Sequence, residues 1–140
     1  MHAPAGAGTH HAMLPPEAQT GLGRLQLQLP PDSGAPAAAR RALRTLPLGE
    51  RAPDVLLLAS ELVAKAVLHA ESREAIELLA ECGPDRTWVE VRDHGPGFTA
   101  PAVSHGHALQ LLAAASERWG IVQERGTSVW FEVGNAQPPA

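Results

Sequence analysis

The stretch Glu61-Leu62-Val63-Ala64-Lys65-Ala66-Val67-Leu68-His69 contains the only lysine of the chain, which follows Glu61 by four residues. Residues four apart lie on one face of an α-helix, so we expect Glu61 and Lys65 to be neighbours. Two glycine-bearing segments follow, Asp93-His94-Gly95-Pro96-Gly97 and His105-Gly106-His107-Ala108-Leu109. An acidic helix followed by two such loops predicts a nucleotide site.

The composition predicts one domain and narrows the class of partner. A chain of 140 residues that is 44% hydrophobic can fill a single core. A net charge of -4 with scattered arginines argues against direct nucleic-acid binding, so we expect protein or small-ligand partners. The single cysteine, Cys82, cannot form an internal disulfide, and no apolar run approaches the roughly 20 residues of a membrane span. Because the N-terminus also lacks a signal-peptide pattern, we expect a cytoplasmic protein with no membrane contact.

The two ends of the chain carry no apolar periodicity. Residues 1–23 are rich in Ala, Gly, Pro and His and predict a disordered tail, because they cannot bury enough surface to offset the entropy of ordering them. Residues 135–140 predict a second tail, which leaves 24–134 as the ordered domain. Three histidines of the first tail, at positions 2, 10 and 11, could bind a transition metal, but a solvated tail is the simpler interpretation.

The order of predicted elements indicates an α+β fold. Alternating leucines over 25–29 predict a half-buried strand. Asp32 and Ser33 offer caps for a helix over 35–46, and Pro53 begins a second helix over 53–70. A short helix is expected after Gly106, ending near residue 117, and the remaining strands are expected over 75–81, 87–93, 119–123 and 128–133. This order predicts a largely antiparallel sheet with its helices on one face.

The two long helices are expected to bury one stripe each and to leave charge outside. The residues expected to point inward are Leu43, Leu46, Leu57, Leu58, Leu62 and Val63, and those expected outward on the first helix are Arg40, Arg41 and Arg44.

The residues around the glycine loops have both a functional and a plain structural interpretation. A carboxylate at Asp93, after a strand, can accept a hydrogen bond from an exocyclic amine while Gly95 and Gly97 let the backbone approach a ligand, although the same pattern occurs in ordinary turns. Gly106 precedes a helix, and helix N-termini favour phosphate oxygens. Glu61 and Lys65 could equally form a surface ion pair worth a few tenths of a kcal/mol.

From about Leu25 to Val133 the chain resembles the GHKL, or Bergerat-fold, ATP-binding superfamily, in particular its bacterial serine-kinase anti-sigma-factor branch. The helix motif of that branch, Glu-Leu-Val-Thr-Asn-Ala-X-X-His, is matched at five positions of 61–69. Its two glycine boxes are matched by Asp93, Gly95 and Gly97 and by Gly106 and Leu109. A Trp-Gly pair and a Gly-Thr-X-Val-Trp-Phe ending also recur, as Trp119-Gly120 and 126–131.

The resemblance implies a two-layer α/β sandwich of the histidine-kinase-like ATPase type with an ATP pocket over the sheet. It implies that Asp93 binds the adenine amine, that the loop after Gly97 closes over the phosphates, and that Leu109 and Thr127 belong to the pocket. Glu61 takes the place of the general base, which in active members orients a serine or threonine hydroxyl of a small anti-anti-sigma protein. The implied partners are a sigma factor, such an anti-anti-sigma protein, or both, and a homodimer stays open.

Two positions depart from the family pattern on the phosphate side. Lys65 replaces the asparagine that holds Mg²⁺, and an ammonium has no lone pair with which to ligate a metal. Lys65 could instead pair with a phosphate, a contact of about 4 kcal/mol at 4 Å and an effective dielectric constant of about 20 before desolvation, or pair with Glu61 inside the pocket. Ala108 replaces the second glycine of its box and could crowd the phosphates. We therefore expect that ATP binds more weakly than in the family and that Mg²⁺ takes no part in its binding.

Three functions and one metal site stay open at this point. The chain could be an anti-sigma-type regulator with impaired phosphotransfer, an active Mg²⁺-dependent protein serine kinase, or an interaction module without nucleotide. A zinc site built from histidines is a separate hypothesis, its candidate ligands being His69, His94, His105 and His107. Three tryptophans are expected to anchor the core or a partner surface, Trp88, Trp119 and Trp130.

Overall fold

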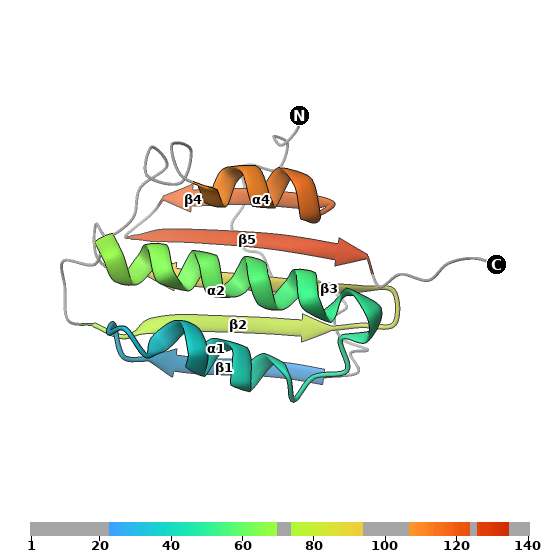
Figure 1. The fold of residues 1–140 in the computed structure, drawn as a ribbon, viewed down its shortest axis with the longest axis horizontal. Coiled ribbons are helices and arrows are strands. Elements are labelled where there is room, and N and C mark those ends of the chain that lie inside the picture. Colours follow the sequence, from blue (N-terminus) through green and yellow to red (C-terminus); the bar gives the residue numbers. More distant parts are fainter. Residues whose placement is uncertain (1–22, 70–73, 94–106, 124–125, 135–140) are drawn as a thin grey trace.

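The computed structural model describes residues 23–69, 74–93, 107–123 and 126–134. These residues form a five-stranded sheet with three α-helices packed over one of its faces (Figure 1). The strands are β1 (Gly23–Leu29), β2 (Ile76–Cys82), β3 (Arg86–Asp93), β4 (Arg118–Gln123) and β5 (Thr127–Gly134), and the helices are α1 (Ala35–Leu43), α2 (Ala52–His69) and α4 (His107–Ala115), with a 3₁₀ turn η2 (Gly49–Arg51) before α2. The predicted α+β class, the antiparallel sheet and the placement of the helices are confirmed.

The sheet has the strand order β1-β2-β3-β5-β4, and every neighbouring pair is antiparallel. β2 and β3 form the predicted hairpin, in which the Gly83 N–H donates to the Arg86 carbonyl at 2.8 Å. The leucines of β1 all lie on the less exposed side of the strand and alternate with the exposed Arg24, Gln26 and Gln28, as a strand with one buried face requires. Each predicted strand is found, with ends that differ from the expectation by at most two residues.

The first helix is shorter than predicted. α1 ends at Leu43 rather than near residue 46, and the next residues bond three back, with the Thr45 N–H donating to Ala42 at 3.1 Å and Leu46 N–H to Leu43 at 3.0 Å. A chain tightened in this way ends the helix before Pro47, which could not continue it. Asp32 does not cap α1 directly, because its carboxylate accepts the Gly34 N–H at 2.9 Å in the turn before the helix.

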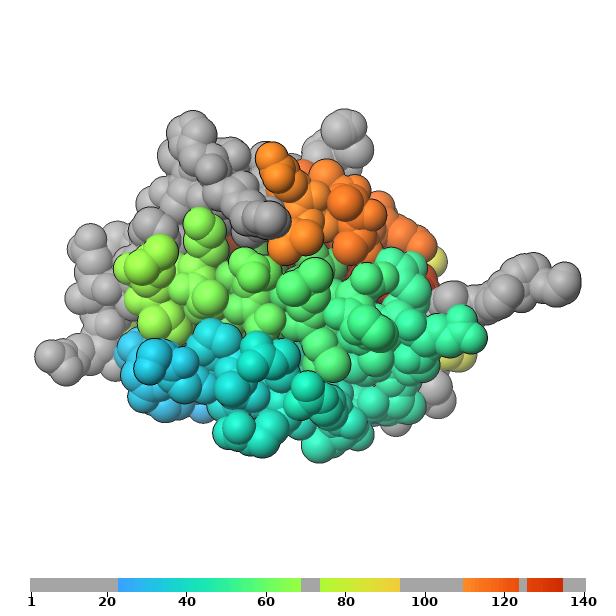
Figure 2. All heavy atoms as spheres, viewed as in Figure 1, coloured from blue at the N-terminus to red at the C-terminus, as the bar shows by residue number. Residues whose placement is uncertain are grey.

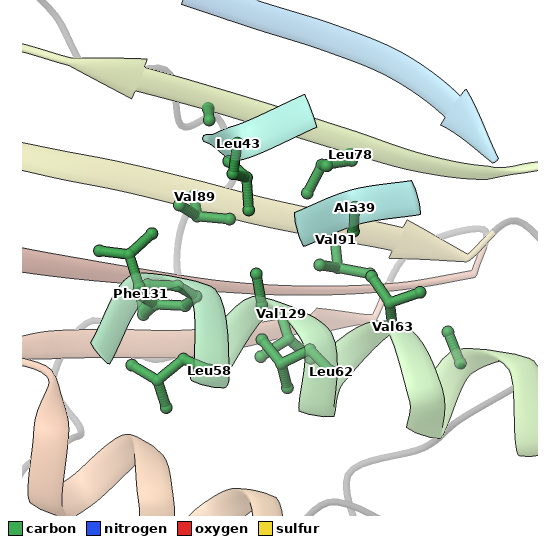
Figure 3. Packing of buried hydrophobic residues seen from close by; sticks show 14 of the residues in the cluster. Ala39, Leu43, Leu58, Leu62, Val63, Leu78, Val89, Val91, Val129 and Phe131 are labelled. Carbon is green, nitrogen blue, oxygen red and sulfur yellow. The ribbon is translucent and has the colours of Figure 1, made fainter. Parts of the chain in front are cut away.

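The core lies between α1, α2 and the helix-facing rows of the sheet. Leu58 and Leu62 of α2 lie over Val129 and Phe131 of β5, whereas Val63 lies nearer β3 (Figure 3). All five of these side chains are at most 1% exposed. The buried side of α2 therefore packs over two strands, with Leu58 and Leu62 over β5 and Val63 nearer β3.

The expectation that Leu57 belongs to this stripe is wrong, because its side chain is 44% exposed. Successive helical residues are rotated by about 100°, and the buried stripe continues from Leu58 through Leu62 to Val63. Leu57 lies one such step outside that stripe and faces solvent. Leu46 is only partly buried, since the helix ends before reaching it.

None of the described helices is both long enough and apolar enough to cross a membrane.

Candidate functional site

Two buried polar residues face each other where β3 ends and β5 begins. Asp93 is the direct cross-strand partner of Thr127, and each is 4% exposed. Both continue the helix-facing rows, since Asp93 follows Val89 and Val91 at alternate positions and Thr127 precedes Val129 and Phe131. At this end of the sheet, the apolar residues that face the helices are therefore followed by a carboxylate and a hydroxyl.

The backbone before Thr127 needs a glycine. Gly126 has φ of 117°, which side-chain-bearing residues rarely adopt. The Gly-Thr pair at 126–127 thus has a physical reason, because the glycine turns the chain into β5 so that Thr127 enters the sheet opposite Asp93.

The second half of α2 lies at the same end of the molecule. Figure 1 shows the C-terminal end of α2, the end of β3, the start of β5 and the first turn of α4 gathered at one side of the fold. Figure 2 shows α2 lying between α1 and α4 on this helical surface. The second half of α2 and Asp93 therefore lie at the same end of the fold, and α2 contacts β3.

Glu61 and Lys65 lie on the flank of α2 that faces α4 and β5. Each follows a core leucine by three residues, Leu58 and Leu62, and these two leucines point toward β5 (Figure 3). Both polar residues are partly exposed, as expected at the border of a buried stripe. The helix thus presents a carboxylate and an ammonium along one border of the candidate site.

Glu61 and Lys65 do not form an ion pair with each other. The salt bridges among the described residues involve other groups, and none joins these two side chains. Both predicted forms of the pair, a surface bridge and an ion pair closing the pocket, are therefore wrong. Spacing of four residues allows such a contact but does not hold two long side chains together.

The remaining predicted site residues are only partly accessible to description. Ala108 and Leu109 lie in the first turn of α4, at the same end of the fold as Asp93. The glycine-box positions 95, 97 and 106 fall in 94–106, outside the described residues. The histidine cluster is untested for the same reason, since His94 and His105 lie in that segment, although the residues that are described include no group of three metal-binding side chains.

One residue that the sequence analysis did not include lies at this end of the sheet. Gln123 ends β4 and is the direct partner of Thr127, so one row of the sheet runs from Asp93 through Thr127 to Gln123. It continues the alternation of Trp119 and Ile121, which pack against the core, and it is exposed. That alternation is a signal in the sequence, but only the strand order shows that Gln123 adjoins Thr127.

The opposite face of the sheet is charged and does not belong to the site. Arginines and buried glutamates alternate across it, for example Arg92 beside Glu90 at 2.9 Å and Arg118 beside Glu132 at 2.9 Å. Burial lowers the pKa of Arg92, but the hydrogen bonds and charges of Glu90 and Glu77 outweigh that effect and raise the pKa, so the guanidinium stays charged. A cavity of about 380 Å³ on this side is lined in part by Arg24, Glu81 and Trp88, away from Asp93.

The donor set of the site fits a nucleotide base better than it fits Mg²⁺. The buried carboxylate of Asp93 can accept a hydrogen bond from an amine, and the Thr127 hydroxyl can donate or accept one. Mg²⁺ requires oxygen ligands, and the Lys65 ammonium on the neighbouring flank of α2 cannot supply one. Neither a protein-family model nor a curated protein matches the chain.

Proposed function

We propose that this chain is a nucleotide-binding regulatory protein of the anti-sigma type, with a two-layer sandwich of the Bergerat type. The observation that carries the proposal is the register of β3 and β5, which brings Asp93 and Thr127 face to face under the α2 layer. This register supports the proposal, because it brings Asp93 and the Gly-Thr pair at 126–127 to the end of the fold where the second half of α2 also lies, as an ATP pocket of the GHKL type would need. A plain turn after a strand would not require a buried carboxylate opposite a buried hydroxyl.

In this proposal each residue has a separate task. Asp93 accepts a hydrogen bond from the exocyclic amine of adenine, and Thr127 completes the polar edge beside it. Glu61 occupies the general-base position on the flank of α2, and Ala108 and Leu109 bring the N-terminal turn of α4 toward the phosphates. Lys65 stands where the resemblance places the Mg²⁺-ligating asparagine, so a nucleotide can bind without transfer of its phosphate. This favours a regulator over an active Mg²⁺-dependent serine kinase.

The decisive experiment is calorimetric titration of the purified protein with ATP and ADP, comparing Asp93→Asn with Asp85→Asn. Asp85 is exposed in the turn at the other end of β3, so the control makes the same chemical change away from the site. We expect Asp93→Asn to weaken binding about 10- to 150-fold, the range for losing a hydrogen bond to a charged group, and Asp85→Asn to leave it unchanged. Absence of nucleotide binding by the unaltered protein, or equal losses in both variants, would contradict the proposed site.

The partner part of the proposal is tested separately. Affinity capture with the sigma factors and small anti-anti-sigma proteins of the host, each purified, should retain at least one of them, and ATP should change the amount retained. If nucleotide binds but no sigma factor or antagonist associates, the nucleotide site stands and the anti-sigma assignment falls.

A further inference from the structure

Lys65 lies on the flank of α2 beside the candidate site and forms no ion pair with the acid that its helix offers. The nearest acid on the same helical face is Glu61, four residues earlier, and the two side chains do not pair. Lys65 is partly exposed, and because it follows Leu62 by three residues it lies on the flank of α2 toward which Leu62 points. A cation in this position is open to an incoming anion.

The same position is unsuited to a divalent cation. An ammonium has three donors and no lone pair, so it repels a metal ion where an amide oxygen would ligate one. It does match phosphate oxygens, with which lysine forms short, charge-assisted hydrogen bonds in many nucleotide sites. Lys65 and Mg²⁺ therefore compete for one task, which is to neutralise the phosphates of the nucleotide.

We propose that this protein binds a nucleoside triphosphate without a divalent cation, with the Lys65 ammonium holding the phosphate oxygens that a metal ion would otherwise neutralise. The inference rests on the proposed nucleotide site and specifies how its phosphate side works. The ligand is the metal-free anion of the nucleotide, and no phosphate is transferred, because the bridging metal that makes the γ-phosphate a good electrophile has no place beside Lys65.

The test is titration with ATP and with adenosine, each in excess EDTA and in excess Mg²⁺. We expect ATP to bind at least as tightly in EDTA as in Mg²⁺. Lys65→Ala should weaken ATP binding in EDTA about tenfold or more and leave adenosine binding unchanged, because adenosine has no phosphate to contact. Lys65→Asn should restore a preference for ATP with Mg²⁺, because its amide oxygen can ligate the metal.

Arg41→Ala serves as the matched control. Arg41 is exposed on α1, so its replacement removes one positive charge from the helical layer without touching the flank of α2. Lys65 lies on a helix and is not buried, so Ala and Asn should be tolerated, and thermal unfolding of each variant verifies that it is folded.

The outcomes separate this inference from the function beneath it. If neither ATP nor adenosine binds under any condition, the nucleotide site itself is wrong. If ATP binds only with Mg²⁺, or if Lys65→Ala binds ATP in EDTA as tightly as the unaltered protein, the nucleotide site stands and the role of Lys65 is refuted. An equal loss in Arg41→Ala would reduce the effect to overall charge and would also refute it.

Discussion

Leu57 and Leu58 are adjacent, chemically identical and on one helix, yet the structure assigns them opposite roles. Leu58 is 1% exposed and packs over β5, whereas Leu57 is 44% exposed. Replacing Leu58 by alanine removes about three buried carbon groups at about 0.8 kcal/mol each and leaves a cavity, so we expect a loss of about 3 to 5 kcal/mol in the free energy of unfolding. Leu57→Ala loses about half of the transfer term, creates no cavity and gains helix propensity, so its cost should stay below about 1 kcal/mol.

Urea unfolding followed by circular dichroism measures both variants in one experiment. With a slope of about 1 to 1.5 kcal/mol per molar urea, the two midpoints should differ by about 2 M. Equal losses, or a larger loss for Leu57→Ala, would mean that α2 is rotated about its axis by about one residue. That result would also refute the site, because the same rotation would carry Glu61 and Lys65 off the flank that faces β5.

Three further substitutions test packing, a partly buried hydrogen-bond donor and the turn before β5. Gly120→Val should destabilise the protein by about 1 to 3 kcal/mol and shift its tryptophan fluorescence, because a Cβ at Gly120 would lie 2.7 Å from the Trp130 indole nitrogen; unchanged thermal unfolding would contradict this. Arg51→Ala should cost about 1.5 to 3 kcal/mol in urea unfolding, because its guanidinium donates to backbone carbonyls at the ends of α4 and β5 at 2.8 and 3.4 Å, and Arg51→Lys should recover less than half of that loss. Gly126→Ala should cost about 1 to 3 kcal/mol, since φ of 117° is strained for alanine, and it should also weaken ATP binding measured by calorimetry by moving Thr127; wild-type affinity would separate this turn from the site.

The elements of this fold could be predicted because their signals are local. Three alternating leucines define β1, and the turn residues at 83–85 define the hairpin of β2 and β3. The position of Asp93 at a strand end also follows from its neighbours in the sequence. Such patterns depend only on residues a few positions apart, so no knowledge of the packed structure is needed.

The misses share a different cause, which is dependence on tertiary neighbours. A run of leucines at 56–58 fits several helical phases, and only the sheet beneath α2 selects the one that exposes Leu57. An ion pair between Glu61 and Lys65 was one interpretation of their spacing, yet spacing cannot show which neighbours compete for each side chain. Gln123 was missed because the order β3-β5-β4, which makes it a neighbour of Thr127, is set by contacts between distant strands.

The absence of the Glu61–Lys65 pair changes what a lysine at this position means. An internal ion pair would have closed the site by satisfying both charges, and binding a nucleotide would then have required breaking it. With the two groups separate, the acid and the cation can act on different parts of a ligand, and the ammonium is the group suited to phosphate. Under the proposed function, a lysine at this position would remove the metal from the binding equilibrium without removing the nucleotide. Under the proposed function, such a protein would respond to the concentration of nucleotide and not to that of free Mg²⁺, which is the difference that titrations in EDTA and in Mg²⁺ measure.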